Sequence, residues 1–338
     1  MYISIFFHPL CPPTILTTHA RHTFDRALRT LPPSLHSRIW VRYLLWAEIK
    51  GGATMVAVYR RYLAVDPTIT ERFTDRLLAP TSGPPRPLEA AKLLLSLARK
   101  AARGEYTSPE GKSPYQLLCD WLDVVEKFSD DVGMNVEETV TSNATVEEEA
   151  ETDTSPNGLL SKSDGDDDVD SKAQPAYDQD EDPTSPRKLN IEHIIHKDGL
   201  KVYKDQAGRL WTGLATYWIK RTEFDRAKET FERGMASVLA IRDFTQIFDS
   251  YAEFGESLMS AMMESLNDED DEAEAAETEK ELDIKMKEFE ELMDRRPFLV
   301  NDVLIRRNPN DVQEWEKRIA LWGDDDEKVC HKNAWILY

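Results

Sequence analysis

The stretch that decides the fold is RDFTQIFDSYAEFGE, at residues 242–256. Its four aromatic residues, Phe244, Phe248, Tyr251 and Phe254, follow one another at spacings of 4, 3 and 3, which places them on one face of an α-helix. Charged and amide residues fill the other faces, so the stretch predicts an amphipathic helix with an aromatic seam. The seam is either a packing face or a binding site. We predict packing, because aromatic side chains bury large areas.

The same aromatic-first pattern occurs at three other places in the chain. A leading aromatic residue is followed by further residues at helical spacing, and Trp211 lies 37 residues before Phe248, close to the ~34 of tetratricopeptide units. The three other stretches are Trp40-x2-Tyr43-x2-Trp46, Trp211-x2-Leu214-x3-Trp218 and Trp315-x2-Arg318-x2-Leu321.

A second type of helix accompanies the first. It reads TFDRALRTLP at residues 23–32, VYRRYLAVDP at 58–67 and TFERGMASVL at 230–239. A small residue, such as Ala27 or Gly234, allows a neighbouring helix to approach closely, and a terminal proline prevents the helix from continuing. Two helix types that recur without strand-like alternation predict an all-α fold, an α-solenoid of antiparallel helix pairs.

Apolar residues at helical spacing predict the individual helices. We expect them at 36–50, 53–65, 70–79, 87–103, 114–128, 190–203, 208–221, 223–239, 242–266 and 281–294. Pro297 and Pro309 should separate two further helices, the last of them near residues 311–321.

The net charge of −21 is concentrated in two acidic stretches. Residues 129–186 carry about −16 and residues 264–281 about −9, which leaves the rest of the chain near +4. The first stretch is poor in aromatic residues and cannot bury enough apolar surface to fold, so we predict that it is disordered. Two serines in it, Ser155 and Ser185, precede a proline and are candidate phosphorylation sites.

These features predict the domain organisation. We expect residues 1–19 to be a poorly ordered N-terminus or the product of an error in the predicted gene. We expect residues 323–338 to be an atypical C-terminal end. Helical repeats occupy 20–128, 188–264 and 281–322, with a disordered acidic insertion at 129–187 and a second acidic insertion at 265–280. Both ends of the chain read as those of a fragment or an incomplete gene.

Four blocks of sequence, in this order, resemble a known family. They are ARHTFDRALRTLPPSLHSRIW, KVYKDQAGRLWTGLATYWIKRTEFDRAKETFERGM, RDFTQIFDSYAEFGES and RRPFLVNDVLIRRNPNDVQEWEKR. They closely resemble the Syf-type pre-mRNA-splicing factors, whose animal counterpart is known as the XPA-binding protein. The resemblance covers about residues 20–328, apart from the acidic stretches and residues 80–112.

The resemblance implies both a fold and a role. Members of this family are long arrays of half-a-TPR (HAT) repeats that act as nuclear scaffolds in the NineTeen-associated part of the spliceosome. The chain would correspond to the N-terminal part of such a protein, with spliceosomal proteins as its partners.

Most of the distinctive residues are predicted to pack the repeats against one another. The packing residues are Phe24, Ala27, Trp40, Tyr43, Trp46, Tyr59, Trp211, Leu214, Trp218, Phe231, Gly234, Phe248, Tyr251, Phe254 and Trp315. Five arginines are candidate contacts to a partner or to RNA phosphate: Arg242, Arg295, Arg296, Arg306 and Arg307. Salt bridges within the protein are the alternative for these arginines.

Other chemistry finds little support in the sequence. His193 and His196 share a helix face but lack an obvious set of further metal ligands, and the Gly111-Lys112-Ser113 stretch lacks the earlier glycine of a phosphate loop. No nucleophile–base or paired-carboxylate arrangement stands out, and the three cysteines lie far apart, as expected in a reducing compartment. We therefore expect no enzyme, cofactor, metal, membrane span or small-molecule substrate.

The function predicted from these observations is a non-catalytic helical-repeat scaffold of the spliceosome, located in the nucleus. Two alternatives stay open. One is a repeat protein that contacts RNA, weakly or through its partners, since the body outside the acidic stretches is near neutral. The other is a generic tetratricopeptide-type adaptor.

Overall fold

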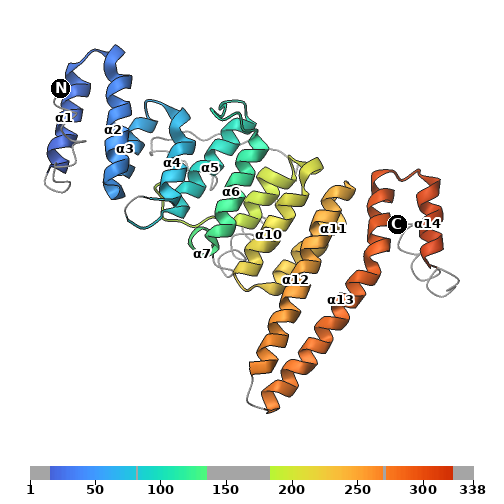
Figure 1. Ribbon diagram of the computed structural model, residues 1–338. Helices are drawn as coiled ribbons and strands as arrows, with labels where there is room; N and C mark the ends of the chain where they lie inside the picture. Colours follow the sequence, from blue (N-terminus) through green and yellow to red (C-terminus); the bar gives the residue numbers. More distant parts are fainter. Residues whose placement is uncertain (1–15, 81–82, 135–182, 269–271, 323–338) are drawn as a thin grey trace, which may run out of the picture. The chain divides into compact units, whose positions relative to one another are not determined.

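The structure, a computed structural model, describes residues 16–80, 83–134, 183–268 and 272–322 (Figure 1). Within these ranges the regular elements are helices, and an isolated bridge between Gly133 and Leu189 is the β-type contact. The all-α prediction is confirmed. None of the described helices is both long and apolar enough to cross a membrane. The chain divides into two compact units, Met1–Asn190 and Ile191–Tyr338, which we describe separately.

The first unit is a row of helices in which each packs on the next. It contains α1 (Thr17–Thr30), α2 (His36–Lys50), α3 (Gly52–Leu63), α4 (Thr70–Leu78), α5 (Pro87–Ala102), α6 (Pro114–Lys127) and the single turn α7 (Ser129–Val132). Gly51, with a φ of 66°, ends α2, because a positive φ suits glycine. Ser113 and Gln116 form a capping box that begins α6.

The core of the first unit is built by the aromatic residues of α2. Phe24 of α1 stacks on Tyr43 with ring centroids 4.4 Å apart and also touches Trp46. On the other side, Trp40 meets Tyr62 of α3 at 5.0 Å. Because the three template residues of α2 lie one helical turn apart, one helix binds both of its neighbours through stacked rings.

The two ends of the first acidic stretch meet in the first unit. The backbone N–H of Met134 donates to the carbonyl of Leu189 at 3.0 Å, and the N–H of Leu189 donates to the carbonyl of Val132 at 2.9 Å. Ser129, Val132 and Met134 are buried, so the ordered chain extends beyond residue 128, the predicted boundary. Residues 135–182 of the predicted insertion lie outside the described residues.

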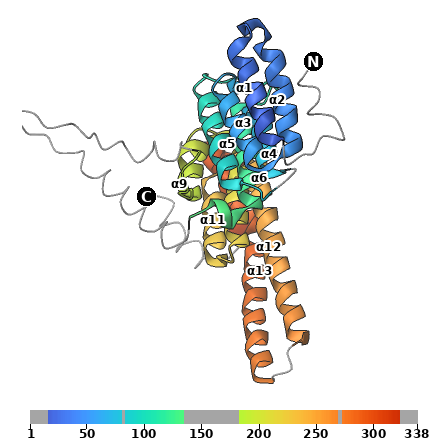
Figure 2. The same ribbon diagram turned by 90° about the vertical axis from the view of Figure 1, so that its left-hand side faces the viewer.

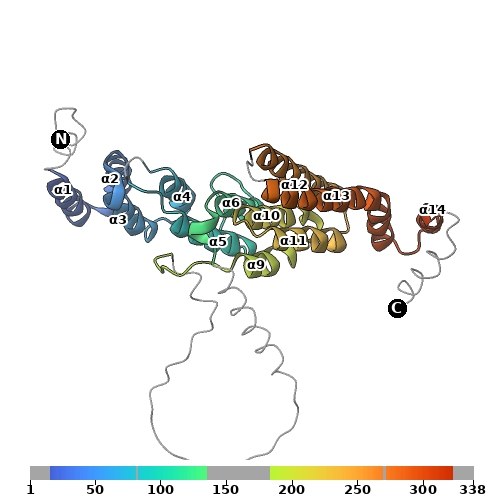
Figure 3. The ribbon, with the colours of Figure 1, turned by 90° about the horizontal axis from the view of Figure 1, so that it is seen from below.

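The second unit begins with short elements and continues into long helices. It contains α9 (Ile191–Ile194), a π-helical turn at Ile195–Leu200, α10 (Gly208–Lys220), α11 (Phe224–Ser237), α12 (Ile241–Asp268), α13 (Glu272–Arg307) and α14 (Val312–Trp322). Seen from below in Figure 3, α10 lies with α11 on one side and α12 on the other. The predicted helix 190–203 is thus broken into α9 and the π-helical turn.

The pair α12–α13 extends well beyond α10 and α11 (Figure 2). Its two helices approach closely at Gly255, where an added Cβ would lie 2.9 Å from the ring of Phe289. The predicted acidic insertion at 265–280 is mostly helix, since α12 runs to Asp268 and α13 begins at Glu272. Ala and Glu are strong helix formers, which explains why this stretch continues the two helices instead of interrupting them.

The prediction that Pro297 separates two helices was wrong. Helix α13 continues through Pro297 to Arg307, and Figure 1 shows it changing direction along its C-terminal part. Proline removes one backbone hydrogen bond and bends a helix, but neighbouring contacts can hold the helix on both sides of the bend. Here Val303 is buried, and Leu299 and Val300 pack against the core of the unit.

Candidate interaction surfaces

The aromatic seam of α12 lies in the core of the second unit. Phe244 and Phe248 are 1% exposed, and their ring centroids are 5.8 Å apart. Tyr251 stacks on Phe231 of α11 at 4.9 Å, and Phe254 lies 6.3 Å from the same ring. These contacts leave little of the seam for a partner. Burial raises the pKa of Tyr251 to about 12, with Glu232 adding to the effect.

The structure places the other predicted packing residues in or beside the cores. Gly234 lies against Trp211, where an added Cβ would be 3.1 Å from the indole, so the small residue permits the predicted close approach. Ala27, Phe254 and Trp315 are only half-buried. The buried residues of the set are Phe24, Trp40, Tyr43, Trp46, Tyr59, Trp211, Leu214, Trp218, Phe231, Gly234, Phe248 and Tyr251.

Two of the five candidate arginines form ion pairs across the second unit. Arg295 of α13 donates to both carboxylate oxygens of Glu232 on α11, at 3.2 and 3.0 Å. Arg296 lies 3.4 Å from Asp249 and 4.9 Å from the centroid of the Phe248 ring. Both side chains are still about half exposed. An RNA phosphate would have to compete with these intramolecular partners.

The other three candidate arginines differ in their surroundings. Arg306 donates to the backbone carbonyls of Met235 and Val238, at 3.3 and 2.8 Å, and so satisfies acceptors at the end of α11. Burial lowers the pKa of Arg306. Arg307 is exposed, and the side chain of Arg242 is 78% exposed with a carboxylate of Asp243 3.6 Å away. The structure therefore does not gather the five into one patch of free cations, and their contact role stays a prediction.

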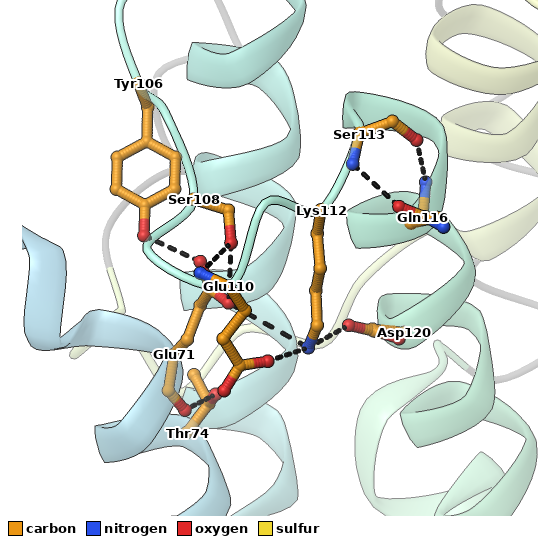
Figure 4. Close-up of polar contacts among 9 residues, drawn as sticks. All are labelled: Glu71, Thr74, Tyr106, Ser108, Glu110, Lys112, Ser113, Gln116 and Asp120. Atoms are coloured by element: carbon orange, nitrogen blue, oxygen red, sulfur yellow. Dashed lines mark hydrogen bonds and ion pairs between the residues drawn. The ribbon is translucent and has the colours of Figure 1, made fainter.

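A cluster of polar side chains that the sequence analysis missed lies between α4, α6 and the loop after α5 (Figure 4). The carboxylate of Glu71, which is buried, accepts hydrogen bonds from Tyr106 at 2.7 Å and from Ser108 at 3.1 Å. Burial raises the pKa of Tyr106, and the hydrogen bond to Glu71 raises it further. The cluster anchors the loop between α5 and α6 on α4.

Lys112 completes this cluster, where its ammonium group is surrounded by carboxylates. Its Nζ lies 2.8 Å from Asp120, 3.1 Å from Glu110 and 3.8 Å from Glu71. The hydrogen bond to Asp120 raises the pKa of Lys112. With three carboxylates around the ammonium group and the Ser113 hydroxyl used as a helix cap, this stretch is a structural joint.

A similar joint connects α2, α3 and α4. Glu48 of α2 accepts a hydrogen bond from the Tyr59 hydroxyl and another from Arg72 at 2.7 Å. Burial alone would raise the pKa of Glu48, but the hydrogen bonds from Tyr59 and Arg72 lower it. Polar side chains in the first unit thus join neighbouring helices.

The two histidines considered as metal ligands lie in a packed environment. The ring of His196 meets the edge of Trp211 at 5.4 Å, and its Nε2 lies 3.2 Å from Arg233. Burial lowers the pKa of His196, and the positive charge of Arg233 lowers it further. Among the described residues, no three His, Cys, Asp or Glu side chains gather as a metal site would require.

An apolar groove of about 640 Å³ runs between α13 and α14. Pro297, Val300 and Leu304 line one side, and Ala320 and Leu321 the other. The two helices are also joined by Arg318, which forms an ion pair with Asp302 and lies over the ring of Phe298. The predicted template therefore has a buried arginine in α14 at the position of the buried Tyr43 in α2.

Helices joined in succession by aromatic rings and ion pairs define a helical-repeat protein. The chain belongs to the Syf1 family of pre-mRNA-splicing factors, as two family models show. The "Pre-mRNA-splicing factor Syf1/CNRKL1 N-terminal HAT repeat" matches residues 6–68, and the "Pre-mRNA-splicing factor SYF1 middle HAT repeat" matches residues 177–334.

Similar proteins carry the same family name. The chain is 48% identical over 367 aligned residues to pre-mRNA-splicing factor SYF1 of Mycosarcoma maydis, covering 97% of the chain and 34% of that protein. It is 38% identical to the Neurospora crassa protein, with 93% and 31% covered, and 33% identical to the human protein, with 90% and 28% covered. The chain thus spans about a third of the length of these relatives.

Proposed function

We propose that the chain is the repeat scaffold of a spliceosomal protein, and that it supports pre-mRNA splicing by holding other proteins in place. Two findings support this proposal: the chain belongs to the Syf1 family, and the aromatic residues of its repeated helix pattern pack in the cores of the repeats. Stacked helical repeats build a continuous core and leave an extended surface for several partners. The name shared by the relatives supports a role in splicing, and a role in splicing supports a nuclear location.

The proposed scaffold is non-catalytic. The ionisable clusters around Glu48, Glu71 and Glu232 each join two or more helices. Catalytic groups have to be positioned toward a substrate, whereas these groups are directed toward one another. Their arrangement supports a structural role, and the partners we propose are proteins of the spliceosome.

Direct RNA contact is a less favoured proposal. Arg295 gives two donors to Glu232, Arg306 bonds two backbone carbonyls and Arg296 lies over a phenylalanine ring, so these three side chains are directed to separate partners and do not converge on one phosphate. Arg242 and Arg307 are exposed and would supply only a weak, salt-sensitive contact. Protein–protein contact therefore agrees better with the geometry.

Splicing in a nuclear extract tests the proposal. The extract is depleted of the full-length protein that contains this chain, and a reporter pre-mRNA is then added. We expect intron removal to fall and to recover on addition of the purified full-length protein. A second add-back carries Trp46→Ala, which removes a fully buried ring from the first unit, and its matched control carries Val41→Ala on the exposed face of the same helix.

The control should restore splicing fully, and Trp46→Ala only partly, because the repeat core is weakened. Splicing that proceeds unchanged in the depleted extract would contradict the proposal.

A further inference from the structure

A pocket of about 450 Å³ lies where the chain returns to the first unit after the first acidic stretch. Residues 183–186 form one wall, and Arg60 and Arg86 lie in the same pocket. The first turn of α5 lines it as well, together with the carboxylates of Glu89 and Asp131. Two guanidinium groups, a helix N-terminus and a serine-containing segment thus share one space.

The two arginines retain hydrogen-bond donors toward this pocket. Arg60 uses Nε and Nη2 on Oε1 of Glu89, at 2.7 and 2.6 Å, and Nη1 of Arg86 lies 3.6 Å from Oε2 of the same carboxylate. A guanidinium has five N–H donors, so neither group is saturated by Glu89. Both side chains are more than 40% exposed and can turn toward a further anion.

The returning segment is held at its backbone. Lys92, which is 1% exposed, donates from Nζ to the backbone carbonyl of Ser185 at 3.0 Å. Lys188 donates to the carbonyl of Asp130 at 2.5 Å. These contacts fix the serine at the pocket, and the Oγ of Ser185 accepts a hydrogen bond from the backbone N–H of Arg187 at 3.3 Å. Ser185 is half-buried, and its neighbours Thr184 and Pro186 are exposed.

The sequence around this serine is that of a substrate for a proline-directed kinase. Ser185 is followed by Pro186, and Lys188 supplies a basic residue at the third position after the serine. The proline also holds the serine backbone away from helical conformations. The other Ser-Pro pair, at Ser155, has Gly158 at that third position and lies outside the described residues.

We propose that Ser185 is a phosphorylation site, and that Arg60 and Arg86 hold its phosphate at the N-terminus of α5. In the transfer, Oγ of Ser185 forms a bond to the γ-phosphorus of ATP and the bond to the leaving ADP breaks. The hydroxyl proton passes to the catalytic base of the kinase. This modification does not depend on the proposed splicing role.

The charges at the pocket explain how the phosphate would be held. A phosphoserine carries about −1.5 to −2 charges at neutral pH and three acceptor oxygens. Arg60 can donate to it while still hydrogen-bonded to Glu89, and Arg86, whose Nη1 lies 3.6 Å from that carboxylate, can turn toward it. The N-terminal end of α5 adds a favourable dipole. Asp131 is exposed, so water screens its repulsion. The phosphate would fasten residues 183–186 to α5.

Phosphorylation itself is tested with the purified chain, ATP and a cyclin-dependent kinase, with sites mapped by mass spectrometry. We expect phosphate on Ser185, its loss in Ser185→Ala and in Pro186→Ala, and its retention in the matched control Thr184→Ala. Absence of phosphate from Ser185 in the wild-type chain would overturn the proposal.

Docking of the phosphate is tested by the rate at which a phosphatase removes it. A phosphopeptide of residues 181–189 serves as the undocked reference. We expect phosphate on the folded chain to leave at least about tenfold more slowly, because it must first leave the arginines. Arg86→Gln, and Arg60→Gln with Arg86→Gln, should raise the rate toward that of the peptide. Arg103→Gln, at an exposed arginine that pairs with Glu105, should not.

Two outcomes would overturn the proposal that the arginines hold the phosphate. One is equal rates for the folded chain and the peptide, a comparison that needs no variant and no assumption about folding. The other is a slow rate that persists in both arginine variants, since the phosphate would then be protected by something else. Thermal melting of each variant shows whether the first unit is still folded when the rate is measured.

Discussion

Substitution Phe248→Ala tests whether the aromatic seam is core or surface. Phe248 is 1% exposed in the second unit, where it packs beside Phe244 and under the guanidinium of Arg296, 4.9 Å from the ring centroid. Truncation of a buried phenylalanine costs roughly 3–5 kcal/mol. Loss of the cation–π contact adds about 0.5–1 kcal/mol at a partly exposed site. We therefore expect the free energy of unfolding of the second unit to fall by about 4 kcal/mol.

Hydrogen exchange read by mass spectrometry measures this loss locally. Each repeat contacts mainly its neighbours, so the effect should be confined to the second unit. Peptides from α10, α11 and α12 should exchange faster by roughly a thousandfold where exchange requires opening of the unit. Peptides from α5 and α6 should be unchanged. The matched control is Met263→Ala, on the same helix but 53% exposed, which should change the free energy by less than about 0.5 kcal/mol.

A loss below about 1 kcal/mol for Phe248→Ala would refute the packing argument. It would mean that the ring is free in solution and that the seam is available to a partner. An equal acceleration in α5 and α6 would contradict the expectation that the effect stays within the second unit.

Three further predictions concern polar groups. Arg306→Gln should lower the free energy of unfolding by about 1–3 kcal/mol in urea melts, because two carbonyls at the end of α11 lose a charged donor, whereas Arg307→Gln at an exposed site should have little effect. The pKa of Tyr251 is raised to about 12, so its neutral form stabilises the fold up to about pH 10 and that stability falls as the pH rises toward 12. In urea melts at pH 9 and pH 11, Tyr251→Phe should reduce the alkaline loss of stability by about 1 kcal/mol, and an unchanged loss would show that this tyrosine is not responsible. Tyr106→Phe should cost about 1 kcal/mol because a buried carboxylate on α4 loses a donor, while Glu105→Gln at an exposed carboxylate should cost almost nothing; equal effects would contradict the anchoring role of the loop cluster.

The helices themselves could be predicted from the sequence because their signals are local. The 4-3-3 spacing in α12 and the pattern Trp40–Tyr43–Trp46 in α2 report helical periodicity directly. Packing of these faces followed from the size of the side chains, and Gly234 against Trp211 shows why a small residue recurs in the second helix type.

The polar joints could not be predicted, because their partners are distant in sequence. Glu71 and Tyr106 are 35 residues apart, and Arg295 and Glu232 are 63 apart. Neither pair has a period or a spacing that marks it. Whether each candidate arginine forms a contact within the protein therefore depends on which helix packs opposite it, and only the tertiary structure determines that.

The errors at α13 have a common physical origin. Proline and dense negative charge are both unfavourable signals for a regular packed helix when read locally. In α13 the helix-forming Ala and Glu residues and the packing around Leu292 and Val303 outweigh them. Packing contacts thus outweigh the helix-breaking effect of Pro297, and the break predicted there is a bend within one helix.

The most direct test of the central claim is quantitative co-purification. The full-length protein that contains this chain is tagged in cells and recovered from nuclear extract, and its associated proteins are compared with those of the Phe248→Ala and Met263→Ala variants. A repeat scaffold of the spliceosome predicts that splicing proteins dominate the wild-type and Met263→Ala samples and are depleted with Phe248→Ala. Wild-type protein that recovers no splicing proteins, or recovers cytosolic chaperone complexes in their place, would contradict the account.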